Sequence, residues 1–294
     1  MQKRTASHSE SGKFASLRIR NSYYFLLLVL TLFLLNGCQQ NSTSLSTTTP
    51  TVDVQKTNRE RGEQIIAENL KREAAPYRKS RVRLTVTSEK EPTQIYVLAI
   101  SRKHTEAETR TLTEIIEPKE DQDLATLTVE QKGKPTVSIA YVSSTNKFRE
   151  SGTGKIFFGG LTAQELLGEW HKYDSRLLLE KELGGVKTLE VESTLKPDAD
   201  SVIQRYVSVF RADNYLPIEL RLFGSDGKPL RLFQIKETRP VEGRNVVWRT
   251  EIENYVYKTK VIIETLEMSF PAKLPDSYFE KDYLKSRAAS KQNF

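Results

Sequence analysis

Short segments that alternate apolar and polar residues recur along most of this chain, and this pattern constrains the fold more than any other feature. Typical segments are Val82 to Thr87 and Ile95 to Ile100, each bounded by charged or Gly/Pro-containing turns. Alternation with a period of two indicates β-strands, and Asp226-Gly227, between the alternating segments 218–223 and 230–235, is typical of a hairpin turn. The sequence predicts ten or eleven strands that follow one another as an antiparallel meander.

Several of these strands carry apolar residues on both faces. Ile262 and Leu266 lie opposite Val261 and Ile263 on one predicted strand. A sheet with apolar groups on both sides has to be covered on both sides or curled around other elements.

The elements that cover such a sheet are predicted to be short helices. One begins with Asn58 as its N-cap and ends before Pro76, and a second begins with the Thr162-to-Glu165 capping box. A last short helix is predicted at Pro275 to Phe279. The sequence therefore predicts a mainly β (α+β) fold, in which one strongly curved sheet wraps around short helices.

The amino-terminal segment is typical of an exported protein. A basic stretch precedes the 13-residue apolar run Tyr23 to Leu35, which is followed by Asn36-Gly37 and the single cysteine, Cys38. The order Leu35-Asn36-Gly37-Cys38 resembles the lipobox of bacterial lipoproteins, in which the cysteine sulfur receives a diacylglycerol and the leader is removed. We therefore expect a lipoprotein signal peptide over 1–37 and lipid attachment at Cys38.

Two alternatives for this segment stay open. A transmembrane helix needs about 20 apolar residues, so the run is short for a membrane span. A lone cysteine is otherwise a small buried hydrophobe or a stray thiol.

Charge and composition bound the remaining chain. Of the formal net charge of +7, residues 1–37 carry +4, which leaves +3 for the mature part. Such a small excess does not favour a nucleic-acid-binding surface, so we expect no nucleic acid partner. Residues 38–57 are rich in Ser and Thr and are predicted to be a flexible tether. We expect one folded domain over 58–284, a disordered tail over 285–294, and a monomer.

The sequence indicates no catalytic residues and no metal site. His8, His104 and His171 lie far apart and have no cysteine partners. The segment Gly152 to Ile156 lacks the Ser or Thr that follows the lysine of a phosphate-binding loop. Because no nucleophile with a base can be named, we expect no cofactor and no enzymatic activity, and a hydrolase is the weakest hypothesis.

Five apolar side chains are candidates for ligand contacts, namely Ile156, Phe157, Phe158, Trp170 and Trp248. The first three are bracketed by glycines, which let the backbone bend. Trp170 belongs to the predicted short helix, and for these four residues the alternative is ordinary core packing. The alternation around Trp248 places it inside the curve of the sheet or against the helix from Asn58.

Several motifs, taken together and in order, resemble the outer-membrane lipoprotein-sorting (LolA/LolB-like) proteins. They are Gly159 to Leu167, Asn214-Tyr215-Leu216-Pro217-Ile218, Ser225-Asp226-Gly227-Lys228-Pro229-Leu230 and Leu274-Pro275-Asp276-Ser277-Tyr278-Phe279. The resemblance covers roughly Asn58 to Leu284. It implies an incomplete antiparallel β-barrel, closed by helices, around an apolar cavity that holds acyl chains.

The resemblance also implies a function. Soluble members ferry lipoproteins across the periplasm, whereas a lipid-anchored member looks like an acceptor on the periplasmic face of the outer membrane. Gln39 is not the Asp that retains enterobacterial lipoproteins in the inner membrane, which favours the outer membrane. We expect a lipid-anchored carrier or acceptor that binds acyl chains or lipoproteins. The alternative is an anchored interaction or sensor module that uses the same fold without lipid transfer.

Overall fold

The computed structural model describes residues 52–73, 75–122, 124–131, 134–142, 145–152, 158–162 and 170–291, all within one unit, Thr49–Phe294. Its helices are α1 (Val52–Glu73) and α3 (Lys281–Lys291), and its short 3-10 turns are η1 (Lys119–Asp121), η3 (Phe158–Gly160), η4 (Trp170–Lys172) and η5 (Asp276–Phe279). The strands are β1 (Tyr77–Ser88), β2 (Gln94–His104), β3 (Glu108–Glu117), β4 (Ala125–Gln131), β5 (Val137–Val142), β6 (Lys147–Gly152), β7 (Tyr173–Leu183), β8 (Val186–Leu195), β9 (Arg205–Arg211), β10 (Pro217–Phe223), β11 (Pro229–Val241), β12 (Arg244–Asn254) and β13 (Thr259–Ser269). Among the described helices, none has the length and apolar character that a membrane crossing needs.

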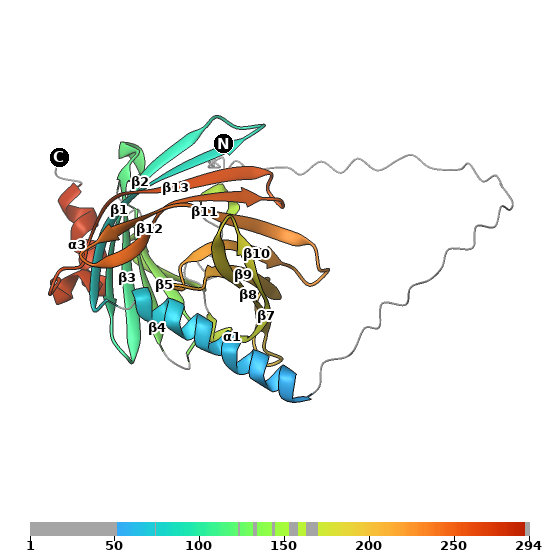
Figure 1. The fold of residues 1–294 in the computed structure, drawn as a ribbon. Helices are drawn as coiled ribbons and strands as arrows, with labels where there is room; N and C mark the ends of the chain where they lie inside the picture. Colours follow the sequence, from blue (N-terminus) through green and yellow to red (C-terminus); the bar gives the residue numbers. More distant parts are fainter. Residues whose placement is uncertain are drawn as a thin grey trace, which may run out of the picture. The chain divides into compact units, whose positions relative to one another are not determined.

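All thirteen strands form one antiparallel sheet in the order β6-β5-β4-β3-β2-β1-β13-β12-β11-β10-β9-β8-β7. Consecutive strands pair with each other from β1 to β6 and from β7 to β13, and the pairing of β1 with β13 joins these two runs into one sheet. The sheet curls strongly without closing, because β6 and β7 remain as its two edges (Figure 1). The predicted mainly β fold, an incomplete and curved antiparallel barrel, is therefore confirmed.

The strand count is higher than the ten or eleven predicted, and β6 shows why. This strand reads Lys-Phe-Arg-Glu-Ser-Gly and has Phe148 as its one large apolar residue. Residues 147–150 are all exposed, and β6 is an edge strand paired only with β5. Edge strands are commonly charged, which blocks further pairing but removes the apolar alternation by which strands are recognised.

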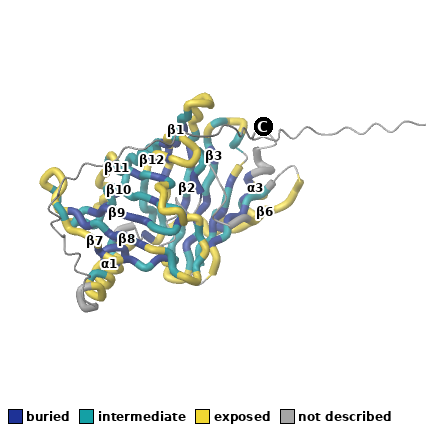
Figure 2. The backbone as a smooth tube through the Cα atoms, turned by 90° about the vertical axis from the view of Figure 1, so that its right-hand side faces the viewer, coloured by how far each residue is buried: buried dark blue, intermediate teal, exposed yellow. Residues whose placement is uncertain are grey.

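The two faces of the sheet are covered by different elements. We call inner the face toward which the sheet curls; register places Val191, Ile252 and Val261 on it. Helix α1 packs on this face through Ile65 and Ile66, which contact buried residues of β7, β8 and β9. The burial pattern follows this arrangement, with buried residues along the strands and exposed residues at the hairpin ends (Figure 2).

The outer face of β3, β4 and β5 is covered by the carboxy-terminal segment. Leu274, Phe279 and Leu284 pack in one cluster with Leu112 and Leu127. Leu112 and Leu127 are directly opposite each other in the register, on the face away from α1. The apolar residues on both faces of the strands thus each have a covering element, as the sequence predicts.

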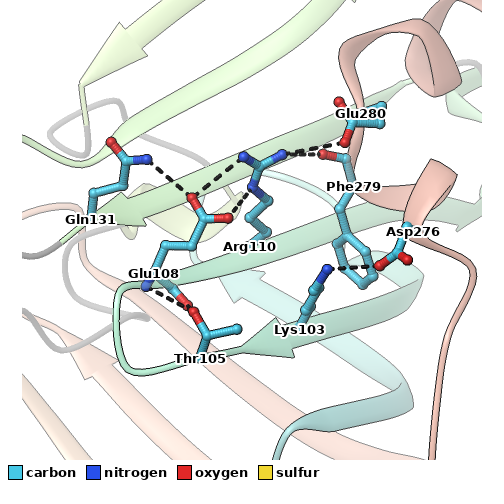
Figure 3. Close-up of polar contacts among 8 residues, drawn as sticks. All are labelled: Lys103, Thr105, Glu108, Arg110, Gln131, Asp276, Phe279 and Glu280. Atoms are coloured by element: carbon cyan, nitrogen blue, oxygen red, sulfur yellow. Dashed lines mark hydrogen bonds and ion pairs between the residues drawn. The ribbon is translucent and has the colours of Figure 1, made fainter.

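A polar network also fastens η5 to the outer face (Figure 3). Arg110 Nη1 donates a hydrogen bond to the Phe279 carbonyl oxygen at 2.9 Å, and Arg110 Nε lies 2.8 Å from Glu108 Oε1. Gln131 Nε2 donates to Glu108 Oε2 at 3.0 Å. The hydrogen bonds from Gln131 and from Arg110 lower the pKa of Glu108, so this carboxylate is charged at neutral pH.

Two domain boundaries differ from the predicted ones. Helix α1 begins at Val52, inside the segment 38–57 assigned to the tether; Pro50 and Asp53 are start signals that the Ser/Thr-rich composition obscures. Helix α3 covers most of the predicted tail 285–294, because Leu284 and Arg287 are 2% and 8% exposed against the sheet. The predicted helix over 163–169 lies outside the described residues.

Candidate ligand site on the inner face

An apolar cluster, here called the inner cluster, fills the inner face near the β10–β11 and β12–β13 hairpins. Its buried members are Val86, Leu161, Tyr173, Ile203, Tyr206, Leu222, Phe233, Ile252 and Val261. Phe233, Ile252 and Val261 are successive partners in the register of β11, β12 and β13. Strand alternation therefore directs one side chain per strand to the same point inside the curve.

A second apolar group, here called the apolar wall, continues the inner face across β1, β2 and β3. It consists of Val82, Leu84, Leu98 and Ile115. Phe158 and Ile263 pack against both groups, so the apolar surface is continuous from one to the other. The ring of Phe158 lies 4.3 Å from that of Tyr96 on β2, between centroids.

The turn η3 brings Phe158 into the curve, and its two glycines are required there. Gly159 and Gly160 have φ angles of 63° and 80°, in the left-handed region that favours glycine. A Cβ at Gly159 would lie 2.5 Å from a methyl carbon of Val261, and a Cβ at Gly160 would lie 2.4 Å from the ring of Tyr257. A larger residue at either position would therefore displace Val261 or Tyr257.

Three side chains hold η3 by its carbonyl oxygens, and we call them the carbonyl clasp. Arg231 Nη2 donates to the Gly160 oxygen at 2.9 Å. Asn254 Nδ2 and Thr259 Oγ1 donate to the Gly159 oxygen at 2.9 and 2.6 Å. Arg231 and Asn254 are only 5% and 2% exposed. Hydrogen bonds with such buried donors, one of them charged, are strong, so the clasp fixes the segment that fills this end of the curve.

Helix α1 lies close to the sheet at Gly62. A Cβ there would lie 2.5 Å from the Arg176 Cα atom on β7. Arg59 and Arg61 flank this contact and pair with Asp174 and Glu180 of the same strand. Both ion pairs are largely exposed, so the close backbone contact and the burial of Ile65 and Ile66 determine the position of the helix.

Of the six site residues predicted from the sequence, the structure places two side chains. Phe158 lies inside the curve, between the inner cluster and the apolar wall. Trp248 lies on β12, half-buried, with the Arg239 guanidinium carbon 4.4 Å from its ring centroid, and it belongs to neither group. Trp170 is the first residue of η4, and the structure describes its backbone only.

The remaining predicted residues, Cys38, Ile156 and Phe157, lie outside the described residues. The sequence reasoning also missed Arg231, which sits in the alternating run Leu230 to Phe233 where a charged residue would normally face solvent. Its role depends on the Gly160 carbonyl oxygen, which is 71 residues away in sequence and meets Arg231 only in the folded protein.

Two histidines, His104 and His171, lie among the described residues, and they are on different elements of the fold. His104 ends β2, with Nδ1 2.8 Å from Thr109 Oγ1, and His171 lies in η4. Among the described residues, no three His, Cys, Asp or Glu side chains lie close enough to hold a metal ion.

Comparison with solved structures identifies this fold in other bacterial proteins. A DUF1329 family protein from Desulfovibrio piger is 15% identical, and the match covers 77% of this chain and 99% of that chain with a TM-score of 0.72. A putative outer membrane lipoprotein-sorting protein domain from Vibrio parahaemolyticus is 16% identical over 78% and 100% of the two chains, with a TM-score of 0.71. A LolA superfamily protein from Nitrosomonas europaea is 14% identical over 76% and 98%, with a TM-score of 0.63.

Comparison of the sequence itself gives one family. A protein-family model with the description "Uncharacterized protein" matches residues 107–286, which is more than half of the chain and runs from the start of β3 into α3. No curated protein matches in sequence. The chain therefore belongs to the family of that model, and its fold is the LolA-like fold that its sequence motifs predict.

Proposed function

We propose that this protein is a lipid-anchored component of the bacterial envelope that binds acyl chains on the inner face of its sheet. The observation that carries the proposal is the run of apolar side chains that continues from the inner cluster into the apolar wall, with Phe158 packed against both. The side chains of the two groups are buried in the folded protein, so an acyl chain binds there by separating side chains that contact one another. Apolar contact with an acyl chain strengthens with the area buried, and each CH₂ group of the ligand that is removed from water contributes about 0.8 kcal/mol. No covalent chemistry is needed for this activity.

The anchoring part of the proposal rests on the sequence. Cys38 directly follows a leader-like apolar run, and Gln39 favours the outer membrane over the inner membrane. The likeness in fold to a putative outer membrane lipoprotein-sorting domain supports a role near that membrane. A chain with its own anchor acts as an acceptor of lipoproteins or lipids more simply than as a soluble carrier.

Acyl binding is tested on the unit Thr49–Phe294, which contains all the apolar clusters described above. Native mass spectrometry should detect co-purified lipid, and a fluorescent fatty acid should bind saturably after delipidation. Absence of both signals would contradict the proposal. In cells, Cys38→Ala should leave the protein without acyl chains, as measured by the mass of its amino-terminal peptide.

The packing of the inner cluster favours a second candidate, an anchored interaction or sensor module. Ile203, Leu222 and Ile252 are 0% exposed, and Leu161 is 1% exposed, so the protein's own side chains fill this end of the curve. A filled interior is what a module without lipid transfer requires. Crosslinking in cells that traps one protein partner and no lipid would favour this candidate over acyl binding.

A further inference from the structure

The inner face changes character from β1 to β5, where one row of directly opposed residues carries charges and hydroxyls. The row runs Arg78, Arg102, Thr111, Thr128 and Ser138, each paired with the next across neighbouring antiparallel strands. It lies on the same face as Leu84, Leu98 and Ile115, at an even offset along each strand. We call it the hydroxyl–arginine row.

Two positive charges face each other at the start of this row. Arg78 and Arg102 are directly opposite on β1 and β2, and both are half-buried. Side chains at such positions lie about 4.5–5.5 Å apart at their Cβ atoms, and like charges there destabilise the sheet. Arg102 makes no ion pair with any described residue. An anion bound at Arg102 would place a negative charge beside this guanidinium.

The neighbouring charged groups strengthen the positive potential. By register, Lys147 and Arg149 on β6 lie on the same face, and Glu130 on β4 is the acidic residue among them. His104 lies two residues beyond Arg102; burial, and then the charge of Arg102, lowers the pKa of this imidazole. The imidazole is therefore neutral near pH 7 and does not add to the repulsion.

The hydroxyls of the row supply donors beside the arginines. Thr111 Oγ1 is buried, in a residue only 7% exposed, and has no hydrogen-bond partner among the described residues. Thr128 and Ser138 are also buried, and their hydroxyl oxygens lie 3.1 Å apart. A buried hydroxyl without a partner costs stability, and an acceptor placed between Thr111 and Arg102 would satisfy both groups.

We propose that the hydroxyl–arginine row binds an anionic group, a phosphate or a carboxylate, through Arg102 and Thr111. Arg102 is four residues from Leu98 along β2, a separation of about 13 Å at 3.3 Å per residue. An amphiphile with its head group on the row therefore places its chain along the apolar wall. This second step rests on the proposed function, whereas the anion site itself does not.

Three probes separate the two steps: inorganic phosphate, dodecyl phosphate and neutral dodecanol, each titrated calorimetrically into the unit Thr49–Phe294. We expect dodecyl phosphate to bind at least about tenfold more tightly than dodecanol, because a charged hydrogen bond adds to the same apolar contact. We also expect inorganic phosphate alone to raise the melting temperature.

Matched variants locate the anion. Arg102→Gln should abolish the preference for dodecyl phosphate and leave the affinity for dodecanol unchanged. Thr111→Val keeps the shape of the side chain; it should weaken dodecyl phosphate binding about three- to tenfold without lowering the melting temperature, since the lost hydroxyl has no partner. Arg83→Gln, an exposed change on the outer face of β1, should alter neither affinity.

The outcomes distinguish failure of the site from failure of the proposed function. If dodecyl phosphate and dodecanol bind equally well, or if Arg102→Gln still prefers dodecyl phosphate, the anion site is overturned and acyl binding stands. A third outcome is that inorganic phosphate binds, that Arg102→Gln abolishes this binding, and that neither dodecyl phosphate nor dodecanol binds. This result supports the anion site with a soluble anion as its ligand, and it overturns the proposed function. No binding of any probe overturns both.

Discussion

The inner cluster and the hydroxyl–arginine row lie on one face of one sheet, yet they bury different kinds of side chain. In the inner cluster, apolar residues of β9 to β13 bury one another, and the carbonyl clasp fixes the turn that completes the packing. In the row, two arginines face each other and the Thr111 hydroxyl has no partner among the described residues. The first region is a folded core held mainly by apolar contacts, whereas the second holds charged and hydroxyl groups, among them the Thr111 hydroxyl, that a bound anion would satisfy.

We expect the inner cluster to determine the stability of the fold and the row to determine ligand affinity. Buried groups that are fully satisfied stabilise the fold, whereas buried polar groups without partners are retained at a cost in stability. We therefore expect substitutions in the inner cluster to lower the free energy of unfolding and substitutions in the row to change mainly ligand affinity.

The largest effect is expected for Ile252→Ala. Ile252 is completely buried in the inner cluster, so its truncation leaves a cavity and should lower the free energy of unfolding by about 2–5 kcal/mol. Urea denaturation measures this loss. A matched truncation, Ile95→Ala on β2, removes a side chain that is 52% exposed and should cost much less. Equal losses for the two variants would contradict the assignment of the core.

The next effect concerns the carbonyl clasp. Arg231→Met removes the donor to the Gly160 oxygen while keeping most of the apolar stem, and it should destabilise by about 1–3 kcal/mol. Hydrogen exchange should rise at Leu161, whose amide donates to the Phe158 oxygen, and stay unchanged in β3 and β4. Arg239→Met, a half-exposed arginine on the same strand, serves as the control. A uniform rise across the sheet would show that Arg231 has no local role.

Helix α1 provides a test of how closely the inner face is covered. Gly62→Ala should destabilise by about 1–3 kcal/mol, because the new Cβ would meet the backbone of β7. In an exposed helix the same change would stabilise by about 1 kcal/mol, so the sign is diagnostic. Thermal unfolding decides it, and a gain in stability would mean that α1 packs less closely than the structure shows.

The smallest effect is expected on the outer face, at low pH. The pKa of Glu108 is lowered chiefly by the hydrogen bond from Gln131, and that of Asp276 chiefly by the hydrogen bond from Lys103. Folding depresses both values, so their contribution is fully present above the unfolded values of about 4 and is lost as the pH falls through the folded values.

Proteolysis of the carboxy-terminal segment should therefore increase between pH 5 and pH 3, while the inner cluster, which contains no carboxylate, remains protected. Glu108→Gln should make the segment less dependent on pH. An equal loss of protection in both regions would indicate global acid unfolding instead.

The fold was largely predictable because strand alternation and hairpin turns are local signals. Leu222, Phe233 and Ile252 lie on predicted strands and are buried together, as alternation requires. The strand β6 was missed because its charged edge has no such pattern, and α3 was missed because a few buried contacts, such as that of Leu284, hold an otherwise polar segment.

The site was less predictable because it depends on register. No local sequence pattern connects Arg78 with Thr128. They share a row only because of the registers of three successive strand pairs, and the sequence does not specify these registers locally. Phe158 could be selected from its flanking glycines, whereas Arg231 could not, because a single arginine in a strand normally faces solvent. Residues that act through neighbouring strands become visible only in the folded sheet.

Photolabelling with a diazirine-bearing fatty acid tests the central claim, acyl binding on the inner face, most directly. After saturable labelling of the unit Thr49–Phe294, mass spectrometry should find the modified residues on β1, β2 and β13, where Leu84, Leu98 and Ile263 line the inner face. Excess unlabelled fatty acid should remove the label. Labelling that does not saturate, or that is confined to exposed hairpin residues such as Tyr255 and Val256, would contradict the claim.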